Sequence, residues 1–167
     1  MAAVAMASEG NEHQAKLRAQ YAALPFRKTD GLEIMLISSR DTGRWVLPKG
    51  WPIKGAKPHA VAAVEALEEA GLMGKIAKKP VGAYRYLKRQ RNGAALLCEV
   101  KVFPFHVGKQ RRKWPERGQR TTKWFSPDEA ARLVHEPELQ SIILSFAGAP
   151  LAKPGDVASV TAGRVSS

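Results

Sequence analysis

The stretch "GWPIKGAKPHAVAAVEALEEAGL", residues 50–72, joins a Gly/Pro-rich loop to a segment of strong helix formers. Pro58 suits a first helical turn, because a missing N–H costs little there. Gly71 stands where a left-handed C-terminal cap belongs. The stretch therefore predicts a loop that runs up to Pro58, followed by a helix that ends at Gly71.

Three glutamates on this helix repel one another. Glu65, Glu68 and Glu69 stand at i, i+3 and i+4, so they share one face, and each like-charge pair weakens a helix by roughly 0.2–0.5 kcal/mol. No Lys or Arg lies four residues before or after any of them. Val61 falls on the same face, so the acidic stripe borders the buried one. One interpretation is a solvated acidic face; the other is a cluster of hard oxygen ligands for Mg²⁺ or Mn²⁺.

The composition indicates a soluble globular protein with an anionic partner. The chain has 167 residues and a formal net charge of +12, with 44% hydrophobic and 25% charged residues. Such a charge attracts nucleic acid, polyphosphates, inositol phosphates or acidic membranes. The single cysteine, Cys98, excludes an internal disulfide framework and a zinc site built on several thiolates. Its apolar surroundings predict a buried, inert thiol and no disulfide-linked partner.

No targeting or membrane signal stands out in the sequence. No apolar run approaches the roughly 20 residues that cross a bilayer, and the N-terminal residues lack a basic region followed by a continuous apolar one. We therefore expect no membrane partner and a cytoplasmic location.

The chain is predicted to hold one domain between two tails. Residues 1–14 are small and polar and predict a disordered N-terminal tail, and residues 149–167 predict a flexible C-terminal tail. Residues 15–148 form the predicted domain, without an internal repeat. Strands are predicted at 20–27, 33–40, 44–50, 81–87, 95–107 and 122–126, and helices at 59–70, 126–134 and 138–148. This mixture predicts an α/β (α+β) sandwich with a mixed central sheet.

The stretch at residues 50–72 resembles the signature box of the Nudix hydrolases. Gly50 matches its first glycine, and Glu65, Glu68, Glu69 and Gly71 match its second half with correct spacing. The resemblance implies a Nudix-like α/β/α sandwich and a phosphoanhydride hydrolase that depends on Mg²⁺, with Mn²⁺ as a substitute. We call residues 50–72 the box.

Two positions of the box depart from the family pattern. Ala56 stands in place of a glutamate and Val64 in place of an arginine, two residues that in the family brace the loop against the helix. Loss of one partner would strand a charge, whereas replacing both can be nearly neutral. We therefore expect packing to rebuild the brace, around Trp51, Pro52 and Ile53.

The wider sequence resembles the diphosphoinositol polyphosphate phosphohydrolase branch of the family. The words that carry this resemblance are "EIMLISSRDTGRWVLPKGW", residues 33–51, and "RKWPERGQRTTKWFSPDEAARLV", residues 112–134. It implies phosphate contacts from the Ser-Ser-Arg stretch. The substrate-binding candidates are Ser38, Ser39, Arg40, Lys49 and Arg89.

The resemblance also assigns roles to the acidic residues. Glu65 and Glu69 would bind the metal, with the Gly50 carbonyl as a further ligand, and Glu68 would accept a proton from the attacking water. Other members of the family take their base from elsewhere, so the choice of base stays open. Glu116, outside the box, is a candidate for an extra acidic ligand.

Three functions are compatible with this sequence. The leading one is hydrolysis of diphosphoinositol polyphosphates or dinucleoside polyphosphates, both anionic small molecules. The second is another nucleotide pyrophosphohydrolase or an RNA 5′-pyrophosphohydrolase, because the positive charge also suits RNA. The third is a catalytically silent Nudix module that binds polyanions. The number of metal ions and the oligomeric state stay open.

Overall fold

Strand β1, Arg18–Lys28, lies inside the sheet because its apolar residues serve both faces. Leu24 packs in the core on one side, and its neighbour Ala23 packs in the core on the other. The computed structural model describes residues 17–149, 154–161 and 164–166. In them β1 pairs in parallel with the long strand β7, Ala95–Gln110, whereas the other strand pairs are antiparallel, so the sheet is mixed as predicted.

The described residues contribute ten strands to one sheet. The order along it is β10-β9-β5-β7-β1-β2-β3, with β4 on β1, β6 on β7 and β8 on β2. The remaining strands are β2 (Leu32–Ser38), β3 (Trp45–Val46), β4 (Lys49–Gly50), β5 (Leu72–Ala77), β6 (Gly82–Arg89), β8 (Thr122–Phe125), β9 (Val157–Thr161) and β10 (Arg164–Ser166).

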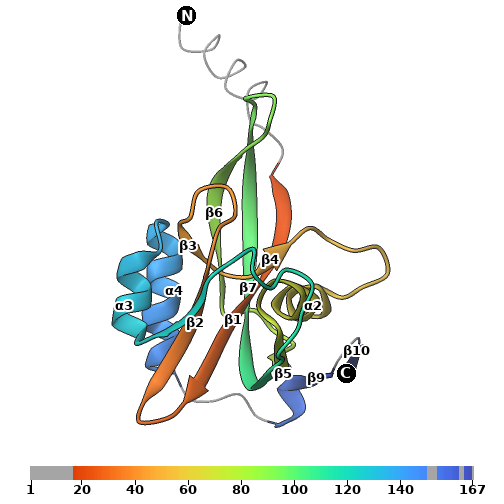
Figure 1. Cartoon of the computed structure of the whole chain (residues 1–167), viewed down its shortest axis with the longest axis vertical. Helices are drawn as coiled ribbons and strands as arrows, with labels where there is room; N and C mark the ends of the chain where they lie inside the picture. The colour runs from red at the N-terminus through yellow and green to blue at the C-terminus, as the bar shows by residue number, and fades with distance from the viewer. Residues whose placement is uncertain (1–16, 150–153, 162–163, 167) are drawn as a thin grey trace, which may run out of the picture.

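Helices cover both faces of the sheet (Figure 1). Helix α2, Pro58–Ala70, packs its small residues against one face, whereas α3, Pro127–Leu133, and α4, Pro137–Ala147, pack side by side on the other. A short 3₁₀ turn, Pro154–Asp156, precedes β9. The α/β/α sandwich is therefore confirmed. Within the described ranges, none of the helices is long and apolar enough to cross a membrane.

The helix ends follow the predicted capping signals. Pro58 opens α2, and Gly71 closes it with φ of 70° while its N–H donates to the Leu67 carbonyl at 2.9 Å. The ring of Trp114 packs against Gly71 so closely that a Cβ at this position would overlap it. At α3, the Ser126 hydroxyl accepts from the Glu129 N–H at 3.3 Å, so Ser126 caps this helix.

The prediction of a flexible tail over residues 149–167 is wrong where the structure describes this segment. Strand β9 pairs with β5, and β10 pairs with β9. Ala158 and Val160 alternate into the core beside α2, a pattern too short and too small-sided to stand out in the sequence. Strand β5, which supplies the free edge, was also not predicted. The N-terminal tail predicted at residues 1–14 lies outside the described residues.

Gly71 carries two constraints, and a pair of substitutions separates them. Gly71→Ala should lower the free energy of unfolding by roughly 1–2 kcal/mol for the left-handed backbone, plus roughly 1–3 kcal/mol for overlap with Trp114. Gly93→Ala, with φ of 84° and open space around it, is the control for the first cost alone. Urea unfolding measures both; equal losses would show that the Trp114 contact has no role.

Candidate active site

The loop glycine of the box brings the backbone against a glutamate. Strand β4 pairs antiparallel with β1, which sets Gly50 opposite Tyr21. A Cβ at Gly50 would overlap the side chain of Glu65, including its carboxylate. A side chain at position 50 would therefore displace the Glu65 carboxylate from its place beside the loop. The role of its carbonyl as a metal ligand stays a prediction.

Glu65 is a half-buried carboxylate without a counter-charge of its own. Among the residues that the structure describes, it forms no ion pair with Lys, Arg or His. Burial, followed by the neighbouring charges of Glu69 and Glu68, raises the pKa of Glu65 to about 8, and its carboxyl lies within hydrogen-bonding reach of Glu69. This position therefore favours a proton or a cation.

Glu69 is more deeply buried than Glu65 but is paired. Its residue is 7% exposed. The carboxylate accepts from Arg120 Nη2 at 3.3 Å and from the Lys49 backbone N–H at 3.3 Å. Burial raises the pKa of Glu69 to about 6, although the charges of Arg120 and Lys49 work in the opposite direction. The helix thus receives its compensation from two other segments of the chain.

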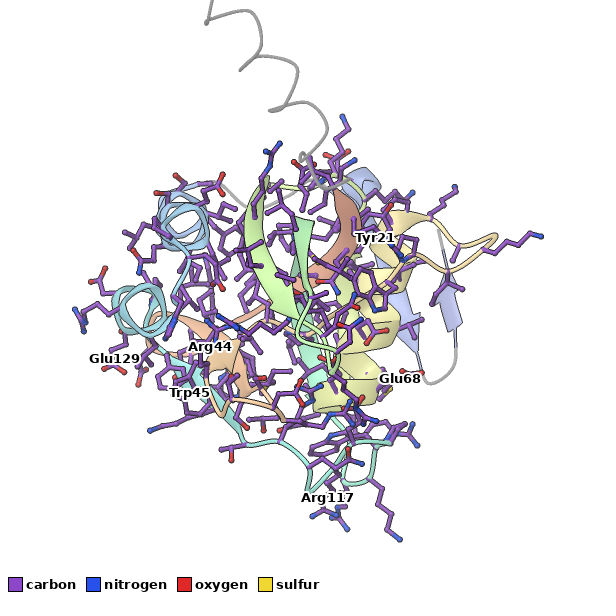
Figure 2. All side chains as sticks on the ribbon, turned by 90° about the horizontal axis from the view of Figure 1, so that it is seen from above. Tyr21, Arg44, Trp45, Glu68, Arg117 and Glu129 are labelled. Atoms are coloured by element: carbon purple, nitrogen blue, oxygen red, sulfur yellow. The ribbon has the colours of Figure 1, made fainter. Side chains whose placement is uncertain are left out.

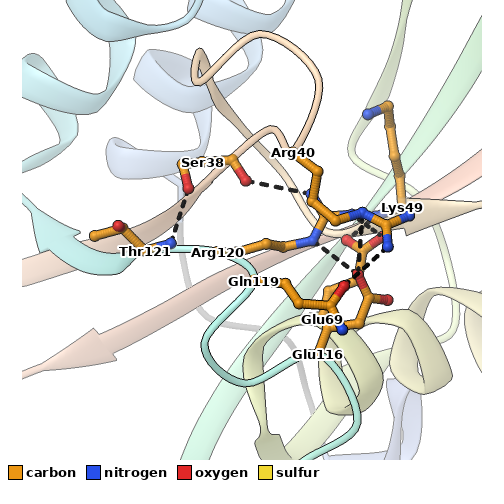
Figure 3. Close-up of polar contacts among 8 residues, drawn as sticks. All are labelled: Ser38, Arg40, Lys49, Glu69, Glu116, Gln119, Arg120 and Thr121. Carbon is orange, nitrogen blue, oxygen red and sulfur yellow. Dashed lines mark hydrogen bonds and ion pairs between the residues drawn. The ribbon is translucent and has the colours of Figure 1, made fainter.

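Arg120 joins three parts of the site (Figure 3). Besides its contact with Glu69, its Nε lies 3.0 Å from Glu116 Oε1 and its Nη1 donates to the Ser38 carbonyl at 3.3 Å. Its side chain is 10% exposed. Arg120 lies in the connection between β7 and β8, residues 111–121, which we call the β7–β8 loop.

The β7–β8 loop also meets Arg40. The Nε of Arg40 lies 3.7 Å from Glu116 Oε1, and its Nη1 donates to Gln119 Oε1 at 3.0 Å. The Arg40 side chain is 54% exposed, so it keeps access to solvent at the edge of the site. Its predicted contact with a substrate phosphate stays a prediction.

One cavity of about 280 Å³ gathers most of the predicted site residues. They come from β4, α2, the end of β2 and the β7–β8 loop, and they are Ser39, Arg40, Lys49, Gly50, Glu65, Glu69 and Glu116. Arg89 lines a neighbouring cavity of about 310 Å³, which Ser39 and Lys49 also line. Ser38 lines neither; its hydroxyl accepts from the Thr121 N–H at 2.8 Å.

Glu68, the predicted base, lies beside this cavity without lining it. Its side chain is exposed, and its carbonyl accepts from the Glu116 N–H at 3.0 Å. Figure 2 shows Glu68 on α2 and Arg117 on the β7–β8 loop below it. Glu68 is thus more exposed than the half-buried Glu65 and the buried Glu69, and its role as base stays a prediction.

The cavity also holds residues that the sequence did not single out for it: Gln20, Asp41, Val46, Trp51, Lys88 and Arg120. Arg120 had one sequence signal, because it follows Glu116 by four residues. Gln20 had none; it is 2% exposed and accepts from the Tyr86 hydroxyl at 2.5 Å.

The predicted packing brace around Trp51 is wrong. Trp51 and Ile53 are 37% and 46% exposed, and the loop that carries them stands away from the core. The cations of Arg18 and Lys88 lie 5.8 and 5.5 Å from the centre of the Trp51 ring. The loop contains Gly and Pro residues and is exposed to solvent up to Pro58, where helix α2 begins.

The donor set fits Mg²⁺ on chemical grounds. In the described part of the chain, no three His, Cys, Asp or Glu residues form a ready-made metal cluster. Mg²⁺ does not need one, because it commonly takes one or two carboxylates and completes its shell with waters and substrate phosphates. Glu65 offers an uncompensated carboxylate, Glu69 a second one beside it, and Gly50 leaves room at the backbone.

Comparison with known proteins finds relatives over most of the chain. Nudix hydrolase 17, mitochondrial, of Arabidopsis thaliana is 28% identical over 130 residues, which are 75% of this chain and 69% of that protein. Nudix hydrolase 13, mitochondrial, of the same plant is 28% identical over 120 residues, 69% of this chain and 59% of the relative. The chain spans about three fifths of the length of the first three relatives. No family model matches the chain.

Solved structures share the fold at low sequence identity. The Escherichia coli dihydroneopterin triphosphate pyrophosphohydrolase aligns with a TM-score of 0.60 and 14% identity, covering 79% of this chain and 98% of that one. The Caenorhabditis elegans Ap4A hydrolase in a binary complex aligns with a TM-score of 0.58 and 17% identity, covering 79% and 96%. With the box, the sandwich and these relatives on one chain, the protein resembles the Nudix hydrolases in sequence and shares their fold.

Proposed function

We propose that this protein hydrolyses a phosphoanhydride bond of a small polyphosphate with the help of a divalent cation, Mg²⁺ in the first place. The observation that carries the proposal is the uncompensated, half-buried carboxylate of Glu65 beside Glu69 and Gly50. A basic protein that leaves a carboxylate without a cation, inside a cavity, has a place for an external one. Phosphoryl transfer needs charge neutralisation and positioning above all.

Glu65 and Glu69 would hold the metal, with the Gly50 carbonyl beside them. A bound Mg²⁺ would screen phosphate charge and lower the pKa of a bound water. The Lys49 N–H and Arg120 orient the Glu69 carboxylate, which leaves its remaining lone pairs for the cation. Glu68, next to these ligands on α2, is the proposed proton acceptor. Glu116, already inside the cavity, is the proposed extra acidic group.

Cations on the cavity wall would bind the phosphates. Lys49, Arg40 and Lys88 all line the cavity that contains Glu65. Burial lowers the pKa of Lys49, although the charge of Glu69 favours its ammonium form. Arg89 in the neighbouring cavity extends this positive field. A substrate with several phosphates would reach both cavities, whereas a single diphosphate would fill one.

The proposed substrates are dinucleoside polyphosphates or diphosphoinositol polyphosphates. Similarity to an Ap4A hydrolase supports the first, and the Ser-Ser-Arg resemblance supports the second. The alternatives are another nucleotide or an RNA 5′ end, and a binding module without turnover. A cytoplasmic location also stays a prediction, since the names of several relatives include "mitochondrial".

A substrate panel should separate these possibilities. With Mg²⁺ we expect diadenosine tetraphosphate to release ATP, or a diphosphoinositol polyphosphate to release phosphate, faster than triphosphorylated RNA releases pyrophosphate or phosphate. Chromatography of the products measures all three. Faster hydrolysis of the RNA would favour an RNA 5′-pyrophosphohydrolase. If no substrate is hydrolysed but polyanions bind in a salt-dependent way, the protein is a binding module without turnover.

Single Glu→Gln changes should locate the chemistry. Glu65→Gln and Glu69→Gln should weaken Mn²⁺ binding and lower Mg²⁺-dependent turnover, and Glu68→Gln should lower kcat by roughly 10²–10⁴-fold if it is the base. Glu129→Gln, the same change at an exposed position of α3, is the control. Isothermal titration and initial rates measure the two effects. Unchanged turnover in both Glu68→Gln and Glu69→Gln would refute this site.

The stability of the metal-free protein should fall as pH rises. The folded-state pKa of Glu65 is raised to about 8 from an ordinary 4.5, so the unfolded chain loses this proton first. The contribution of protonated Glu65 to the free energy of unfolding is complete below about pH 4.5 and is lost as pH rises through about 8. Urea unfolding in EDTA should show this decline in the wild type and a weaker one in Glu65→Gln. Parallel pH profiles would contradict the uncompensated carboxylate.

A further inference from the structure

The box of this chain lacks the arginine of the family pattern, and its helix carries no Lys or Arg. Val64 stands where the family pattern has arginine, and Ala56, on the exposed loop, stands where it has glutamate. Packing around Trp51 does not replace them, because the loop is exposed. A buried glutamate such as Glu69 nevertheless needs a partner, since an isolated charge is costly to remove from water.

We propose that Arg120 performs the task of the missing box arginine from outside the box, as a positioning residue that fixes Glu69 and Glu116 together. The guanidinium uses separate nitrogens for separate partners: Nη2 for Glu69 at 3.3 Å and Nε for Glu116 at 3.0 Å. Its third nitrogen, Nη1, donates to the Ser38 carbonyl. A planar fork of donors can hold three acceptors at once, whereas a lysine ammonium cannot match this geometry.

The backbone on both sides of Arg120 is itself held. The next residue, Thr121, forms two hydrogen bonds with Ser38: its carbonyl accepts from the Ser38 N–H at 2.9 Å, and its N–H donates to the Ser38 hydroxyl at 2.8 Å. Four residues earlier, the Glu116 N–H donates to the Glu68 carbonyl at 3.0 Å. The β7–β8 loop is therefore tied to β2 at one end and to α2 at the other, so the guanidinium has a defined position.

This arrangement has two opposite consequences for the site. The nearly buried charge of Arg120 neutralises part of the acidic cluster, so it competes electrostatically with an incoming divalent cation. The same contacts fix the carboxylate orientations, which turnover requires. Removing Arg120 should therefore raise the affinity for the cation and lower kcat. A general loss of structure would lower both. Only the second consequence rests on the proposed function.

The test compares Arg120→Gln with two matched variants. Arg117→Gln removes the same charge from the same loop, at an exposed arginine whose guanidinium lies 5.7 Å from the centre of the Trp114 ring. Arg120→Lys keeps the charge but lacks the planar set of guanidinium donors. It also replaces Arg120→Gln as the test if that variant does not fold. Mn²⁺ affinity, measured by electron paramagnetic resonance of the free ion without substrate, is the first readout. The second is kcat at saturating Mg²⁺, and thermal unfolding in EDTA checks folding.

We expect Arg120→Gln to bind Mn²⁺ roughly fivefold more tightly or better and to lose roughly tenfold or more in kcat. Arg117→Gln should stay within about twofold of wild type in both, and Arg120→Lys should keep wild-type affinity with reduced kcat. Equal or weaker Mn²⁺ binding in Arg120→Gln than in Arg117→Gln would overturn the proposal. So would wild-type affinity and kcat in Arg120→Gln. An inactive wild type would refute the proposed function, while the Mn²⁺ comparison still decides the role of Arg120.

Discussion

The contact between Glu69 and Arg120 is the interaction on which the site depends. A carboxylate on a side chain that is 9% exposed cannot stay ionised without a partner, and the helix that carries it provides none. The partner comes from the β7–β8 loop, and the same guanidinium takes Glu116 and the end of β2. One side chain thus connects three segments that are distant in the chain and adjacent in the fold.

The position of helix α2 explains why its glutamates differ. Its alanines pack directly on the sheet, so the helix lies close to the sheet and its flank is shielded from solvent. Glu69 is buried against Lys49 and Arg120, Glu65 is half-buried beside Gly50, and Glu68 faces solvent. Three residues of one type, within five positions, therefore occupy three electrostatic environments. Only the fold makes them unequal, because their spacing alone places them on one face.

Much of the architecture could be predicted because its signals are local. The β1 and β2 runs, the helix between Pro58 and Gly71 and the Ser126 cap all rest on periodicity and capping. Strands β5 and β9 escaped prediction because they are short, contain small residues, and depend on each other's edge for hydrogen bonds. The exposure of Trp51 was missed because a large apolar side chain suggests packing, whereas its loop leads away from the core.

The sequence by itself determined the box, the helix with its three glutamates, the positive charge and the layered fold class, because spacing and composition carry these. Tertiary structure decided which glutamate lies buried, which is paired and which stays without a cation. It also brought Arg120 to Glu69 across 51 positions. Charge compensation acts through space, so a pattern read along the chain shows the deficit on α2 without showing which distant residue meets it.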